Sequence, residues 1–98
     1  MDKLDYIPWR RTSIFKTDKE ETKLYVASIK GEGIFRISGV GAFLWARIDG
    51  NATIRELGEK ITENFTGASI DQINRDVCLL LDQMAEKDLI VYNWDPLA

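Results

Sequence analysis

Polar and apolar residues alternate in the first half of this chain, as they do in strands that bury one face. Residues 23–29 (KLYVASI) follow this pattern, and their β-branched and aromatic side chains favour a strand. Residues 34–37 resume the alternation after a turn at residues 31–33, where two glycines tolerate a positive φ. Residues 14–15 fit a short first strand before the polar stretch 17–21. The pattern therefore predicts three short strands connected by turns.

In the second half, the apolar residues recur every three to four positions, which is the spacing of amphipathic helices. Ser38 is a predicted N-cap for the first helix, and Gly50 is a natural stop for it. Thr53 and Glu56 have the spacing of a capping box at the start of a second helix, and Ser69 begins a third. The apolar stripes of the three helices are Val40, Phe43, Leu44 and Ile48; Ile54, Leu57, Ile61 and Phe65; and Ile70, Ile73, Val77, Leu80, Leu81 and Met84. The third stripe is the longest, so we expect the third helix to cover the core.

Strands followed by helices predict an α+β fold, with a three-stranded antiparallel sheet followed by three helices in a winged helix-turn-helix arrangement. The length of 98 residues predicts one domain spanning residues 1–98. Residues 1–10 are apolar but interrupted by Pro8, and we interpret them as an N-terminal arm laid over the edge of the core. Residues 93–98 are interpreted as a C-terminal tail that contains a turn.

Composition restricts the class of protein further. Hydrophobic residues make up 45% of the chain and charged residues 30%, which indicates a folded domain with one core. No apolar run approaches the roughly 20 residues that span a bilayer, and the start of the chain carries acids and lacks the apolar region of a signal peptide. A single cysteine, Cys78, cannot form an internal disulfide, which fits a reducing cytoplasm. We therefore expect a cytoplasmic protein.

The side chains that usually carry catalysis are scarce. The chain has no histidine, so Cys78 has no imidazole base, and a small buried thiol is the favoured interpretation. No Cys/His pair has metal-ligand spacing, and the Gly39-Val40-Gly41 sequence lacks the third glycine of a dinucleotide fingerprint. We expect no enzyme activity, no metal and no cofactor, which leaves binding as the main class of function.

Two binding functions fit this predicted fold. A winged helix-turn-helix can bind DNA through its third helix, but residues 70–87 hold four acids against two bases, and this charge would repel phosphates. The acids concentrate in the helical half more generally, since residues 39–98 hold ten acids and five Lys/Arg. The alternative is peptide binding, in which an extended peptide adds to a sheet edge and its side chains enter pockets beside a helix. We favour the peptide and keep a DNA-binding regulator as the alternative.

Two blocks of sequence resemble a known family. Residues 37–45 (ISGVGAFLW), followed by Asp49-Gly50 and by residues 53–57 (TIREL), are similar to the PqqD pattern L-N-x-x-G-x-x-I-W, D-G, T-x-x-E-I/L. Residues 76–90 resemble the last helix of that family and the segment after it. Ser38-Gly39 stands where the family has an Asn-Glu type of pair, and Asp88 stands where the family has a glycine. The resemblance covers about residues 34–91.

This resemblance implies a RiPP recognition element, a domain that binds the leader of a ribosomally synthesised and post-translationally modified peptide. Such a domain presents the rest of the precursor to a modifying enzyme. A chain of this size resembles the stand-alone peptide chaperone of pyrroloquinoline quinone or lasso-peptide pathways. The implied partners are the leader and a maturation enzyme, such as a radical-SAM protein or a leader peptidase, with no nucleic acid and no membrane. A monomer and a dimer both fit a sheet with an open edge.

The resemblance also implies where the leader lies, along the last strand and against the third helix. The predicted peptide-binding residues are Ile34, Phe35, Arg36, Ile37, Ser38, Asp76, Val77, Leu80, Gln83 and Met84. Within this set, Arg36 would pair with a leader carboxylate and Asp76 with a basic residue. Trp45 lies off the main stripe of its helix, which predicts either a partly buried anchor or a contact with a partner. Leu79 points away from its stripe, as either an exposed leucine or a second contact.

Overall fold

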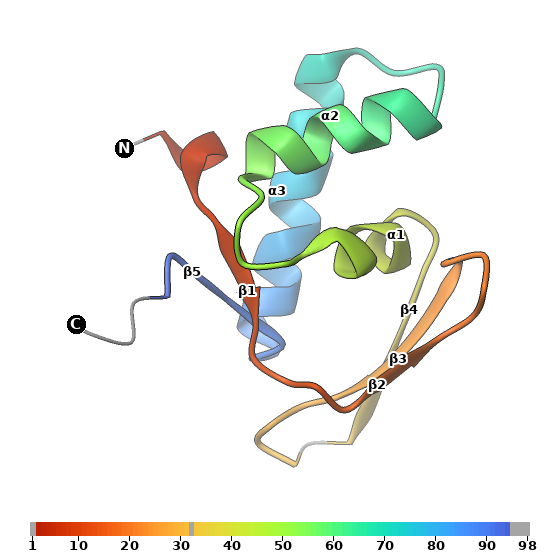
Figure 1. The fold of residues 1–98 in the computed structure, drawn as a ribbon, viewed down its shortest axis with the longest axis vertical. Helices are drawn as coiled ribbons and strands as arrows, with labels where there is room; N and C mark the ends of the chain where they lie inside the picture. The colour runs from red at the N-terminus through yellow and green to blue at the C-terminus, as the bar shows by residue number, and fades with distance from the viewer. Residues whose placement is uncertain (1, 32, 95–98) are drawn as a thin grey trace.

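The computed structural model describes residues 2–31 and 33–94 of the chain. The first of three helices packs against a three-stranded sheet, the second packs on the first and the third, and a two-stranded sheet lies beside the third helix (Figure 1). None of the helices in the described residues is long and apolar enough to cross a membrane.

The predicted three-stranded sheet is confirmed. Its strands are β2 (Phe15–Thr17), β3 (Lys23–Ala27) and β4 (Ile34–Ser38), which pair antiparallel in the order β2-β3-β4. The alternation predicted for β3 is also observed, because Leu24 and Val26 are fully buried while Tyr25 faces solvent. This order leaves β2 and β4 as the two edges of the sheet.

The N-termini of the three helices are capped in three different ways. The first helix, α1 (Val40–Arg47), starts after Gly39, which has a φ of 63° and makes no side-chain capping bond. The prediction of Ser38 as its N-cap is therefore wrong, because the left-handed turn that opens α1 needs a glycine at the next residue. The second helix, α2 (Ile54–Asn64), has the complete capping box of Thr53 and Glu56. The third, α3 (Ile70–Glu86), is capped by the Ser69 hydroxyl.

A second sheet, which the pattern did not predict, joins the two ends of the described chain. The strand β1 (Pro8–Arg10) pairs antiparallel with β5 (Ile90–Tyr92), after a 3-10 helix η1 (Lys3–Asp5). The N-terminal arm thus does pack against the rest of the molecule, as a strand. Most of the predicted tail, residues 95–98, lies outside the described residues.

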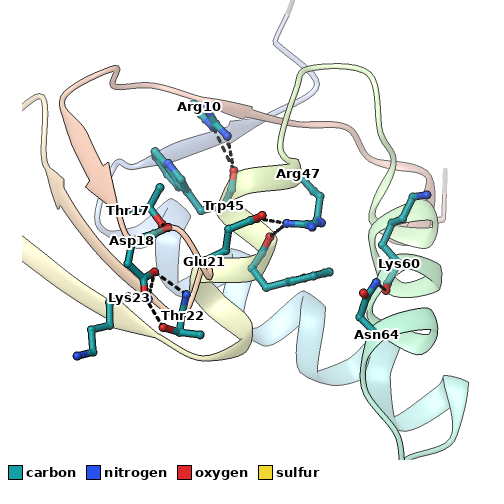
Figure 2. Close-up of polar contacts among 11 residues, drawn as sticks. Arg10, Thr17, Asp18, Glu21, Thr22, Lys23, Trp45, Arg47, Lys60 and Asn64 are labelled. Atoms are coloured by element: carbon teal, nitrogen blue, oxygen red, sulfur yellow. Dashed lines mark hydrogen bonds and ion pairs between the residues drawn. The ribbon is translucent and has the colours of Figure 1, made fainter.

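Trp45 is at the centre of the core and has none of its surface exposed. Its ring packs edge-on against Phe15. The Arg10 guanidinium lies over the Trp45 ring and donates two hydrogen bonds to the Trp45 backbone carbonyl, which Figure 2 shows. The prediction of a partly buried anchor or a partner contact is therefore wrong, because β1 and β2 cover this face of α1. Arg47 in turn forms an ion pair with Glu21 and ties the end of α1 to the turn before β3 (Figure 2).

Asp88 shows how this chain accommodates its departure from the family pattern. The residue follows α3 with a φ of 58°, the left-handed conformation in which glycine is usual. Its carboxylate forms ion pairs with Arg11 at 3.0 Å and with Lys30 at 2.9 Å. The hydrogen bond from Lys30 holds the pKa of the Asp88 carboxyl below its usual value. These contacts support a conformation that an aspartate adopts less readily than a glycine.

Candidate functional site

The open edge of β4 is the first component of the site. Within the described residues β4 pairs with β3 alone, so its other side has no strand beside it. The Gly39 N–H donates to the Thr22 carbonyl at 2.9 Å, which fixes the alternation of the antiparallel ladder. By this alternation, the backbone groups of Phe35 and Ile37 bond to β3. Those of Ile34, Arg36 and Ser38 point to the open edge.

The C-terminal half of α3 faces the inner side of this strand. The Lys87 ammonium lies 5.8 Å from the centre of the Phe35 ring. Gly41 of α1 lets the Ile37 side chain approach closely, because a Cβ there would lie 2.5 Å from Cγ2 of Ile37. The same position is 3.9 Å from Cε of Met84, so Ile37 and Met84 both lie beside the start of α1. Phe35 and Ile37 are half-buried, whereas Met84 is buried. These side chains form an apolar wall beside the open edge.

An apolar cavity of about 380 Å³ continues this wall beyond the end of β4. Its lining includes Val40, Phe65, Asp76, Val77, Leu79 and Leu80. Val40 lies two residues after the end of β4, so the cavity begins where the strand ends. Its volume is within the range of ligand pockets in proteins, which is roughly 300–1,000 Å³.

Of the two flanks of α3, the described residues cover one and leave the other open to a ligand. The flank that holds Cys78 is covered by the N-terminal segment, where Lys3 forms an ion pair with Asp82 at 2.7 Å and the Tyr92 hydroxyl donates to the same carboxylate. Burial raises the pKa of the Cys78 thiol, which disfavours a nucleophilic thiolate. The side chain packs against the core but is half-buried, so it is less enclosed than the buried thiol that the sequence predicts. The opposite flank, with Asp76 and Gln83, is exposed.

The two charged residues of the predicted site differ in their surroundings. Arg36 is exposed on β4 and forms no ion pair with any described residue. Asp76 is exposed at the rim of the cavity and accepts a hydrogen bond from the Gln72 amide at 3.0 Å. Arg36 is free to pair with an incoming carboxylate. Asp76 offers its second carboxylate oxygen to a cation.

The structure places the ten predicted residues on β4 and on α3, and two of them, Val77 and Met84, are buried in the core. The five residues of β4 form the edge, Met84 and Gln83 lie on the C-terminal half of α3, and Asp76, Val77 and Leu80 line the cavity. Sequence reasoning missed the contribution of α1 and α2, namely Val40, Ile61 and Phe65. Phe65 could have pointed to this contribution, because it is the last residue of the second apolar stripe in the sequence. In the structure its side chain is 40% exposed. An apolar stripe residue left exposed indicates a surface that another molecule can cover.

The described residues hold no cluster of three or more His, Cys, Asp or Glu side chains that could bind a metal ion. What the arrangement offers is an unpaired strand edge, an apolar wall and a cavity with one carboxylate. These are the components of β-strand addition, in which backbone hydrogen bonds give affinity and side-chain pockets give selectivity.

Comparison with known proteins adds one finding. A family model described as coenzyme PQQ synthesis protein D (PqqD) matches residues 24–90, which extend from β3 to the first residue of β5. No curated protein matches the chain.

Proposed function

The chain belongs to the PqqD family of RiPP recognition elements, and from this premise we propose that it binds the leader of a ribosomally synthesised precursor peptide and presents the precursor to a modifying enzyme. Members of this family are non-catalytic accessory domains of natural-product biosynthesis. The chain therefore has its role in such a pathway, and the leader-binding mechanism is our proposal for how it acts.

The observation that carries the proposal is the open edge of β4 beside an exposed flank of α3. An isolated exposed edge is a hazard for aggregation, and natural proteins usually cover or charge it. In this chain, the edge has three residues with backbone groups directed outward, and an apolar wall follows it on one side. The edge therefore offers hydrogen-bond partners for the backbone of an extended peptide and an apolar surface for its side chains.

The leader lies antiparallel to β4 in this proposal. Its backbone bonds to Ile34, Arg36 and Ser38, and alternate side chains turn inward against Phe35 and Ile37. The N-terminal end of the bound strand then lies beside the cavity, where an apolar leader residue can insert. Asp76 selects a basic leader residue at the rim of that cavity, and Arg36 selects an acidic residue on the outward side.

The test is a titration of the ¹⁵N-labelled chain with the leader of a short precursor encoded near its gene. Amide shifts are expected to concentrate in residues 34–38 and 73–84. Asp76→Ala and Arg36→Ala remove exposed charges, which contribute about 0–1 kcal/mol to stability. At least one of them should weaken leader binding while the melting temperature stays nearly unchanged.

Two results would contradict the proposal. Shifts confined to residues 53–66, with neither charge variant altering affinity, would place the groove on the other side of the domain. Sub-micromolar, sequence-dependent binding of duplex DNA by the isolated chain would instead favour a regulator. The acidic residues exposed on α3, Asp71, Asp76 and Glu86, oppose that second outcome.

A further inference from the structure

The face of the three-stranded sheet that points away from the helices has an organised surface of its own. The strand register aligns side chains on it in rows across β2, β3 and β4. One row is Ile14, Ala27 and Ile34, since the Ala27 N–H donates to the Ile14 carbonyl and Ala27 pairs with Ile34. The next row is Lys16, Tyr25 and Arg36. We call these six residues the outer sheet face.

The apolar row is unusually exposed for a small domain. Ile14 is 70% exposed and Ile34 73%, and together with Tyr25 and Ala27 they line a shallow depression of about 240 Å³. Single exposed apolar residues are common, but a contiguous patch bordered by polar residues is typical of an interaction surface. Burying these side chains against another molecule would remove apolar area from water and stabilise the complex.

The charged side chains nearest to the apolar row are basic, and Asp18 lies beside Lys23 at the far end of the sheet. Lys16 and Arg36 occupy the second row, and Lys23 follows them on β3. None of these three forms an ion pair within the described residues. A partner that covers this face must therefore present an apolar centre bordered by carboxylates.

The position of the patch relates it to the leader groove, and the next step rests on the function proposed above. The groove uses the inner side of β4 and its open edge, and Arg36 is the one side chain of the outer sheet face that also contacts the leader. The other five side chains of the face stay uncovered when the leader is bound. A leader antiparallel to β4 has its C-terminal end beside Ile34, the first residue of the strand. The segment to be modified follows the leader and so leaves the domain next to the apolar row.

We propose that the outer sheet face is the docking surface for the modifying enzyme, which binds through an acidic surface with an apolar centre. An enzyme at this face lies where the precursor emerges, and the groove and the docking surface are occupied together in a ternary complex. The outward side chains of the bound leader extend the same face beyond Arg36. The enzyme accordingly contacts both the domain and the leader, and it binds the loaded domain more tightly than the empty one.

The test uses the full chain and the purified modifying enzyme encoded near the precursor gene, with and without the precursor. Ile14→Glu places a carboxylate on the strand farthest from the leader groove, and Lys16→Glu reverses a charge beside it. Each should weaken enzyme binding by about tenfold or more, as expected for a central interface residue. The affinity for labelled leader should stay within about twofold, because contacts outside an interface are usually near-neutral. The matched controls are Ile70→Glu and Lys60→Glu, at an exposed isoleucine and an exposed lysine of the helical half.

The outcomes separate this proposal from the proposed function. Unchanged enzyme affinity in both variants, with normal leader binding, overturns the docking surface alone. The proposed function is tested separately, by measuring whether substitutions in the groove weaken leader binding. Two further experiments test other occupants of the outer sheet face. Sedimentation of the chain alone tests a second copy of the chain, and flotation with phosphatidylglycerol-containing vesicles tests a lipid surface. If Ile14→Glu abolishes self-association or vesicle binding but leaves enzyme binding intact, a second copy or a lipid surface takes the place of the enzyme.

Discussion

Replacing Arg36 by proline separates the backbone of β4 from its side chains. The Arg36 N–H points to the open edge and makes no bond to β3, so proline removes a donor that the fold does not use. Proline is tolerated on edge strands when its missing N–H faces solvent. Arg36→Pro should therefore fold, with a loss of stability of about 1 kcal/mol, the span of strand propensities.

The effect on leader binding should be larger than the effect on folding. Without the Arg36 N–H, one carbonyl of the added strand loses its partner, and an unsatisfied group in an interface costs about 1–3 kcal/mol. At about 1.4 kcal/mol per factor of ten, the dissociation constant should rise by about 5- to 150-fold. Loss of the exposed charge accounts for at most about 1 kcal/mol of this, or roughly fivefold.

Two controls make the measurement specific. Arg36→Ala removes the charge and keeps the N–H, so the ratio of the two dissociation constants reports the backbone bond. Thr17→Pro is the matched change on β2, where the bond between Ala27 and Ile14 directs the Thr17 N–H to the opposite open edge. Fluorescence anisotropy with a labelled leader gives the affinities, and thermal unfolding monitored by circular dichroism gives the stabilities.

The reasoning is refuted if Arg36→Pro is folded and binds the leader as tightly as Arg36→Ala. Strand addition at β4 would then be wrong, even if other groove variants weaken binding. A loss of affinity in Thr17→Pro alone would show that the leader adds to β2. These two edges lie on opposite sides of the sheet, so the experiment distinguishes them.

Three further predictions concern stability, pH and the cavity. Thr53→Ala breaks the capping box of α2 and should lower the free energy of unfolding by about 0.5–2 kcal/mol in a denaturant titration, with leader affinity unchanged. Burial alone would raise the pKa of Asp82, but hydrogen bonds from Lys3 and Tyr92 outweigh burial and lower the pKa below 3.8. The stability that this contact contributes is present above that value and is lost as the pH falls through the folded pKa. The free energy of unfolding of Asp82→Asn should therefore depend less on acid pH than that of the unchanged chain. Leu79 is 59% exposed at the cavity, so Leu79→Ser should change stability by less than about 0.5 kcal/mol yet weaken leader binding; equal affinity would remove the cavity from the site.

Much of this fold could be predicted from local signals. The alternation in β3 and β4 specified which side chains face the core, because a strand has a side-chain period of two. The Thr53 capping box is equally local, since its two partners are three residues apart. The family assignment, made from two short blocks, was also confirmed. In each case the interacting residues are close in the sequence, and residue type is enough to identify them.

The parts that were missed depend on distant contacts. The pairing of β1 with β5 joins strands of three residues each, which are too short to show a period, and the first of them begins with Pro8. The burial of Trp45 depends on Arg10 and Phe15, which reach it from other strands. Likewise, the cavity needs Phe65, which directly follows α2, and Leu79 on α3, and the angle between those helices is not encoded in either stripe alone.

In β4, some residues bond to the rest of the fold and the others are available to the proposed ligand. The backbone of Phe35 and Ile37 bonds to β3 while their side chains face inward, and the backbone of Ile34, Arg36 and Ser38 is left for the leader. Since backbone bonds are the same for every sequence, the edge contributes affinity with little discrimination among leaders. Selectivity must then come from side chains, and the cavity with its single rim carboxylate is the most restrictive surface available. Apart from Arg36, the residues that decide which precursor is bound should therefore be found on α2 and α3, outside the strand that holds the peptide.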